Sequence, residues 1–220
     1  MWKTIISRMK KQQFNYALFL VCFVHLFVLP MLNITTVWYY RYGLSLILLL
    51  SVMSLNKLSH KAVLIGLITV ILNLVANVGH ESQLDKIMDW FSFVFLIWVI
   101  ARMVLQVMKV HRVEPVNLLM ALNGYLLLGI LFSSLVFYTE HFSPGSFAES
   151  GKIPDYPDLV YFTLITLTTT GYGDLLPVTH TAKHLSLLVA ISGQFYVAVI
   201  VAILVGKYTN VLIEDRKDKN

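Results

Sequence analysis

Six apolar windows, each close to 20 residues long, constrain this chain more than any other feature of its sequence. They are, in order, Phe14–Leu32, Val37–Leu55, Lys61–Gly79, Lys86–Met108, Val116–Tyr138 and Lys183–Tyr208. A helix of about 20 apolar residues crosses the ~30 Å hydrocarbon core of a bilayer. Only 13% of the 220 residues are charged, which is about half the share in a soluble domain, so this apolar surface needs lipid around it. The sequence predicts an all-α membrane protein with six transmembrane helices.

The lysines and arginines predict which way these helices face, because cytoplasmic loops are enriched in them. Most of the 17 lie in the N-terminal segment, in the loops after the second and fourth windows, and in the C-terminal tail. We therefore expect both termini in the cytoplasm of a multi-pass cell-membrane protein. Lys109 and Arg112 can meet anionic lipids of the inner leaflet. Nucleic acid is not an expected partner, because the net charge of +5 follows this loop pattern.

The segment between the fifth and sixth windows contains Thr-Thr-Thr-Gly-Tyr-Gly-Asp at residues 168–174. Before it, Asp158 can cap a short helix from Leu159 to Thr168 that dips into the membrane. The partially negative end of that helix then points at the bilayer centre and favours a cation there. Gly171 and Gly173 permit backbone angles that turn successive carbonyls to one side. Four such loops around one axis form stacked rings of carbonyl oxygens that replace the water shell of a cation, so we expect a homotetramer.

This motif resembles the selectivity filter of the tetrameric potassium-channel superfamily, and the chain looks like a bacterial six-transmembrane member, placed in the inner membrane. The resemblance implies that K⁺ binds the carbonyls of four consecutive residues and the hydroxyl of the first, with Gly173 completing the filter. These four residues are Thr169, Thr170, Gly171 and Tyr172. It also implies that the ring of Tyr172 packs against the pore helix. The residues expected to support the filter are Tyr161, Phe162, Thr168 and Asp174.

Two positions depart from the usual pattern of that superfamily. Thr170 stands where valine or isoleucine is usual, which puts a hydroxyl behind the filter. Ile165 occupies a pore-helix position where some members carry a glutamate that supports the filter aspartate. Asp174 can instead accept a hydrogen bond from the phenol of Tyr161. The residues before this helix, Thr139–Pro157, are rich in proline and glycine, so we expect an irregular loop there.

The sixth window carries two features that bear on gating. Gly193 interrupts an apolar helix, and it serves either as a hinge or as a point of close helix packing. Val197, Val201 and Val205 share one helix face. In a tetramer this face can line the cavity and close it by dewetting, whereas a valine stripe that faces lipid has the same sequence.

The chain divides by layout into residues 1–113, a four-helix bundle like a voltage sensor, and residues 114–220, the pore domain. A voltage sensor needs several positive charges within the membrane field, typically 3–4 per subunit. The fourth window contains a single internal arginine, Arg102. The bundle is therefore a degenerate, arginine-poor sensor, and we expect weak voltage dependence or none.

The function expected from these features is passive conduction of K⁺, with no cofactor besides the permeant ion. The chain shows no nucleophile with its base, no paired carboxylates and no cluster of metal ligands within a span, which argues against an enzyme. Two alternatives stay open. One is a non-selective cation channel, and the other is a non-conducting or regulatory membrane subunit of an ion transport system.

Overall fold

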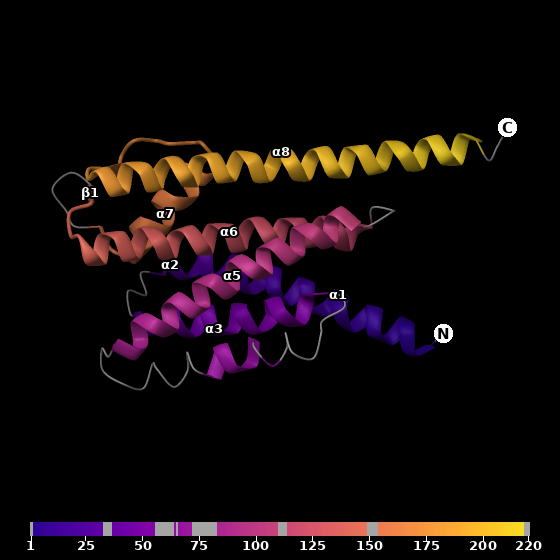
Figure 1. The fold of residues 1–220 in the computed structure, drawn as a ribbon, viewed down its shortest axis with the longest axis horizontal. Coiled ribbons are helices and arrows are strands. Elements are labelled where there is room, and N and C mark those ends of the chain that lie inside the picture. Colours follow the sequence, from indigo (N-terminus) through magenta and orange to yellow (C-terminus); the bar gives the residue numbers. More distant parts are fainter. Residues whose placement is uncertain are drawn as a thin grey trace. The chain divides into compact units, whose positions relative to one another are not determined.

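A computed structural model describes residues 2–32, 37–55, 64, 66–71, 83–109, 114–148 and 154–217, and most of these residues are helical (Figure 1). The chain packs as two compact units. The first contains Met1–Phe27 and Thr36–Gly124, and the second contains Val28–Thr35 and Tyr125–Asn220. The functional division between residues 113 and 114 stays a prediction.

The first unit is built from long helices. They are α1 (Trp2–Phe23), α3 (Val37–Ser54), α5 (Gln83–Lys109) and the beginning of α6 (Pro115–Phe142). Helix α1 packs along α3, and Leu18 of α1 and Ile47 of α3 are fully buried. Polar groups are buried in this unit as well, since Nδ2 of Asn123 on α6 donates to the carbonyl of Asn15 on α1 at 2.9 Å. In a bilayer such bonds satisfy groups that lipid cannot.

The helix that begins at Trp2 changes geometry near its end. Residues Val24–Val28 form a π-helical segment, η1, which is followed by the short helix α2 (Leu29–Met31). Pro30 has no N–H to donate to the carbonyl of Leu26, and its ring crowds that carbonyl. The wider π turn is a common response to such a break in the hydrogen-bond ladder.

Four helices in the described part of the chain are long and apolar enough to cross a membrane. They are Gln12–Met31, Trp90–Lys109, Pro115–Phe142 and His180–Thr209. These agree with the first, fourth, fifth and sixth predicted windows. The second window corresponds to α3, of which Gly43–Ser54 forms a shorter apolar helix. Most of the third window lies outside the described residues, so the total of six spans stays a prediction.

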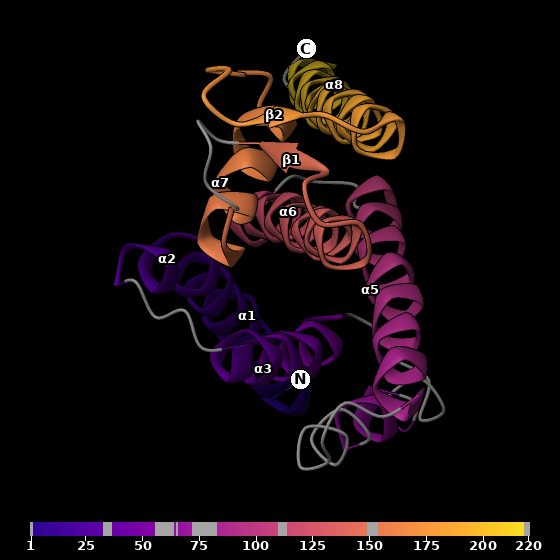
Figure 2. The same cartoon turned by 90° about the vertical axis from the view of Figure 1, so that its left-hand side faces the viewer.

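The second unit contains the end of α6, the helices α7 (Tyr156–Leu167) and α8 (His180–Lys217), and two short strands. Strand β1 (Phe147–Ala148) pairs antiparallel with β2 (Leu176–Pro177), with Phe147 opposite Pro177. Figure 2 shows both strands beside α7. The expected irregular loop at Thr139–Pro157 was therefore wrong at both ends, where Thr139–Phe142 belongs to α6 and Tyr156–Pro157 to α7. It was also wrong at Phe147–Ala148, and residues 149–153 lie outside the described residues. The partner strand lies 29 positions along the chain, beyond the reach of a local composition argument.

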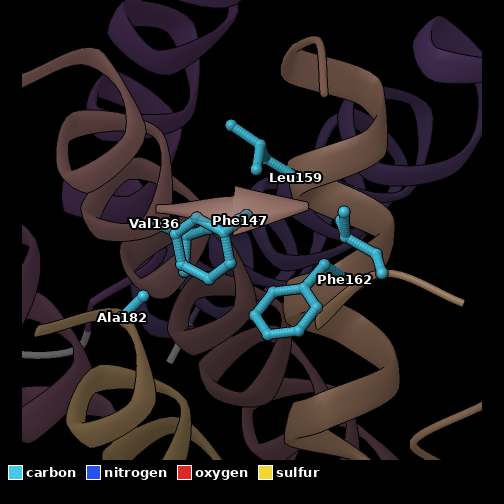
Figure 3. Close-up of a cluster of buried hydrophobic side chains, with 6 residues drawn as sticks. Val136, Phe147, Leu159, Phe162 and Ala182 are labelled. Atoms are coloured by element: carbon cyan, nitrogen blue, oxygen red, sulfur yellow. The ribbon is translucent and has the colours of Figure 1, made fainter. Parts of the chain in front are cut away.

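A buried apolar cluster holds the second unit together (Figure 3). It consists of Val136, Phe147, Leu159, Phe162, Leu175 and Ala182. Its members come from α6, β1, α7, the segment after the Thr/Gly motif, and α8. The rings of Phe147 and Phe162 lie 5.0 Å apart between centroids. The beginning of α7 and Leu175, the residue after the motif, therefore pack into the same core.

Candidate functional site

The pore helix predicted from the sequence is α7, and it begins one turn earlier than expected. Asp155, and not Asp158, is its N-cap, so the predicted start at Leu159 was wrong. The carboxylate of Asp155 accepts from the backbone N–H of Asp158, and that of Asp158 accepts from the N–H of Asp155. This reciprocal capping box satisfies two N–H groups at the end of the helix, and Pro157 fits the first turn because its missing N–H would have no partner there.

The carbonyls at the other end of α7 hold the Thr/Gly segment in place. The carbonyl of Ile165 accepts from the N–H groups of Thr170 and Gly171, at 2.8 and 3.1 Å. The carbonyl of Leu164 accepts from the N–H of Thr168 at 3.0 Å. The last carbonyls of the helix therefore accept hydrogen bonds from the segment that follows it. Ile165 carries this role through its backbone, which its apolar side chain gave no reason to expect.

The backbone of residues 169–173 alternates in handedness. Thr169, Gly171 and Gly173 have φ of 58°, 54° and 81°, whereas no described residue between them has positive φ. At both glycines an added Cβ would meet nothing within 4 Å, so the backbone angle and not the space requires glycine. Thr169 is the only non-glycine residue with positive φ in the described chain. Such alternation is compatible with successive carbonyls that face one side, and that arrangement stays a prediction.

The hydroxyl of Thr170, which the sequence predicts to lie behind the filter, contacts the hydroxyl of Thr168. Its Oγ1 lies 3.0 Å from Oγ1 of Thr168. The Thr168 hydroxyl donates to the carbonyl of Leu164 at 2.8 Å, so Thr170 is the donor of the pair. The Thr170 hydroxyl thus donates to the Thr168 hydroxyl, which donates to a carbonyl of α7. Thr170 stands at the position where valine is usual in the superfamily that the motif resembles.

The predicted hydrogen bond between Tyr161 and Asp174 is confirmed. The phenol of Tyr161 donates to Oδ2 of Asp174 at 2.7 Å, and the N–H of Leu175 donates to Oδ1 at 3.1 Å. The phenol is the main reason that the pKa of Asp174 lies below its ordinary value. Asp174 is therefore held ionised at the end of the segment.

The ring of Tyr172 is not packed against the pore helix within one chain. Tyr172 is 73% exposed there, so its expected packing against Tyr161 and Phe162 stays a prediction. Phe162 is buried and packs on Phe147. Because the ring of Phe162 belongs to the apolar cluster, it does not cover the ring of Tyr172 within one chain.

Gly193 on α8 lies against the end of α7. A Cβ at this position would meet the carbonyl oxygen and carbonyl carbon of Leu167 more closely than real Cβ atoms do. The same carbonyl accepts from the phenol of Tyr125 at 3.3 Å, and the ring of Tyr125 lies 5.6 Å from that of Tyr196. α8 is helical throughout this region. The packing interpretation of Gly193 therefore has direct support, whereas its role as a hinge stays a prediction.

Gln194, the residue after Gly193, was missed by the sequence analysis. Its Nε2 donates to Oγ1 of Thr169 at 3.1 Å. The valines predicted to line a cavity follow on the same helix, and Val197, Val201 and Val205 are 46%, 51% and 58% exposed. This face of α8 is therefore uncovered within one chain, as both the cavity and the lipid interpretations require.

Glu140 is a second residue that the sequence analysis did not single out. It is 6% exposed at the end of α6. Its carboxylate accepts from the backbone N–H groups of Gly145 and Phe147, at 2.7 and 2.9 Å. These bonds fix the turn before β1, and β1 pairs with β2 just after the Thr/Gly motif. A glutamate followed by proline, glycine and serine is too common a pattern to have revealed this role.

Residues 125–210 match the family model described as ion channel. This stretch is less than half of the chain. It contains α7, the Thr/Gly segment and most of α8, which are the elements whose geometry is described above. The prediction that the chain is not an enzyme is confirmed by this match, because ion channels catalyse no covalent step.

Known proteins that are similar to this chain include voltage-gated potassium channels. The chain is 26% identical over 94 residues to the A-type voltage-gated potassium channel KCND3 of Homo sapiens, covering 43% of this chain and 14% of that protein. It is 34% identical over 79 residues to potassium voltage-gated channel subfamily A member 2 of Xenopus laevis. That match covers 36% of this chain and 15% of the relative. The similarity thus spans only a small part of each relative.

Proposed function

We propose that four copies of this chain form a potassium-selective channel. The observation that carries the proposal is the alternation of positive φ at Thr169, Gly171 and Gly173, which turns neighbouring carbonyls to one side. The uncovered ring of Tyr172 adds support, since it leaves a surface for a neighbouring copy, whereas the uncovered valine face of α8 fits a cavity and lipid equally well. The names of the relatives, which include voltage-gated potassium channels, point the same way.

Conduction in this proposal is passive and needs no cofactor. K⁺ sheds its water and binds the carbonyls of Thr169, Thr170, Gly171 and Tyr172, and it moves by repulsion between ions in adjacent sites. The end of α7 contributes the negative pole of its dipole on the approach to these sites. Asp174, held ionised by Tyr161, places a negative charge at the opposite end of the segment.

The first four predicted helices form a bundle with weak or absent voltage sensing in this proposal. Within the described part of α5, Arg102 is the basic residue inside the span, and its guanidinium lies 6.0 Å from the ring centroid of Trp98. Lys109 is the last residue of that helix. One internal charge supplies about 2.3 kcal/mol per 100 mV, well below the 3–4 charges of a working sensor.

The placement in the cell also belongs to the proposal. The distribution of lysine and arginine supports cytoplasmic termini. The bacterial inner membrane is what the family resemblance of the motif implies. In the sequence, Lys109 and Arg112 stand between the fourth and fifth predicted helices, on the predicted cytoplasmic side, so anionic lipid is the expected contact there. Arg112 lies outside the described residues.

The decisive experiment is a reversal potential in planar bilayers, with potassium on one side and sodium on the other. The full-length protein should reverse near the potassium equilibrium potential, and Gly171→Ala should lose this selectivity, because alanine resists a φ of 54°. Gly145→Ala is the matched control. Gly145 also has positive φ and open space around it, but it lies outside the Thr/Gly motif, so its variant should stay selective. Equal permeability to sodium in the unaltered protein would favour the non-selective alternative.

A further inference from the structure

The side chain of Gln194 reaches the first residue of the proposed filter. Its Nε2 lies 3.1 Å from Oγ1 of Thr169, and the two residues are 25 positions apart. The contact depends on Gly193, because the absence of a Cβ there lets α8 touch the Leu167 carbonyl at the end of α7. Close approach of the helix backbone therefore brings an amide to the base of the filter.

The direction of this hydrogen bond has a chemical consequence. An amide N–H can only donate, so the oxygen of Thr169 accepts. A hydroxyl oxygen has two lone pairs, and the bond occupies one of them. It also places a partly positive hydrogen beside an oxygen that would ligate the innermost ion. Gln194 and a cation therefore compete for the same electron density.

We propose that Gln194 sets the cation affinity of the innermost filter site, and lowers it, by donating to Thr169 Oγ1. The inference rests on the proposed function, since it needs the Thr169 hydroxyl to face an ion. Gln194 is a positioning residue in this scheme and touches the ion only through Thr169. The site takes a dehydrated cation of the size of K⁺, and a weaker innermost site releases that ion to the adjoining cavity more readily.

Binding of Ba²⁺ to the full chain, purified in detergent and followed by isothermal titration, tests the proposal. Ba²⁺ has nearly the radius of K⁺ and twice its charge, so it reports on oxygen ligands without requiring current. Gln194→Leu should bind Ba²⁺ about fivefold more tightly, the size of effect expected for one hydrogen bond of average strength. Gln194→Asn should behave similarly, because its side chain is one methylene too short to span the contact. A merely structural role predicts weaker binding, since loosened packing does not tighten a site.

Two controls isolate the hydroxyl. In a Thr169→Val background, Gln194→Leu should no longer change Ba²⁺ affinity, because the acceptor oxygen is gone. Gln106→Leu, the same chemical change on α5, should leave the affinity of the unaltered protein unchanged.

The outcomes separate this inference from the proposed function. Unchanged or weaker Ba²⁺ binding in both Gln194 variants, with a potassium-selective unaltered protein, overturns the role of Gln194 alone. An unaltered protein that passes sodium as well as potassium, and whose Ba²⁺ binding is not displaced by K⁺, overturns both. If Gln194→Leu does not assemble, the asparagine variant decides the question.

Discussion

Substitution of Gly193 by alanine tests whether this residue packs or bends. Alanine in the middle of a helix is favoured over glycine by about 1 kcal/mol. Against this gain stands overpacking, which costs about 1–3 kcal/mol when a side chain is forced into a filled site. A Cβ at Gly193 would meet the backbone carbonyl of Leu167, which lies at the end of α7 and accepts a hydrogen bond from Tyr125. Because this carbonyl cannot easily move, the cost of overpacking is near the upper end of that range, about 3 kcal/mol. The net effect is a loss of about 2 kcal/mol of stability.

The assay is thermal unfolding in detergent, followed by circular dichroism. For a chain of this length each kcal/mol moves the melting temperature by about 2–4 °C, so Gly193→Ala should melt about 4–8 °C lower. Gly206→Ala is the matched control on the same helix, because a Cβ there meets nothing within 4 Å. It should melt about 2–4 °C higher through helix propensity alone. A Gly193→Ala protein that melts as high as the unaltered one would refute the packing argument and favour the hinge.

Three further substitutions probe the surroundings of the filter. Glu140→Gln should lower the melting temperature by several degrees, since its amide turns a donor toward one of the two N–H groups that the carboxylate accepts from, and the N–H of Phe147 is buried. Glu114→Gln, an exposed control, should not lower it. Tyr161→Phe should raise the pKa of Asp174, because the phenol that lowers it is gone. The ionised carboxylate stabilises the fold, and this stabilisation is lost as the pH falls through the pKa, so the variant should lose it at a higher pH. An NMR titration of the carboxyl measures the pKa. Thr170→Val should keep potassium selectivity but lose current faster at low external potassium, because a hydrogen bond behind the filter is gone; identical decay in both proteins would contradict this.

Local patterns in the sequence predicted the elements that carry the proposed site. Apolar windows predicted four helices that the described structure contains, because the length of a helix against a bilayer is a local property. The two glycines of the motif predicted the unusual backbone, since only the residue itself limits φ. The bond between Tyr161 and Asp174 was predictable because a short helix and the segment after it bring the two groups together.

Contacts between distant segments decided the rest. Gly193 was equally consistent with a hinge and with packing until the Leu167 carbonyl was seen beside it. Gln194 and Glu140 have ordinary sequence neighbours, and their partners are set by how α8 meets α7 and how the turn before β1 folds. The sequence by itself thus determined which backbone the Thr/Gly segment can adopt, because backbone angles and helix length depend on residues close together in the chain. Only the tertiary structure decided what holds that segment, because the supporting hydrogen bonds join groups that the fold brings together.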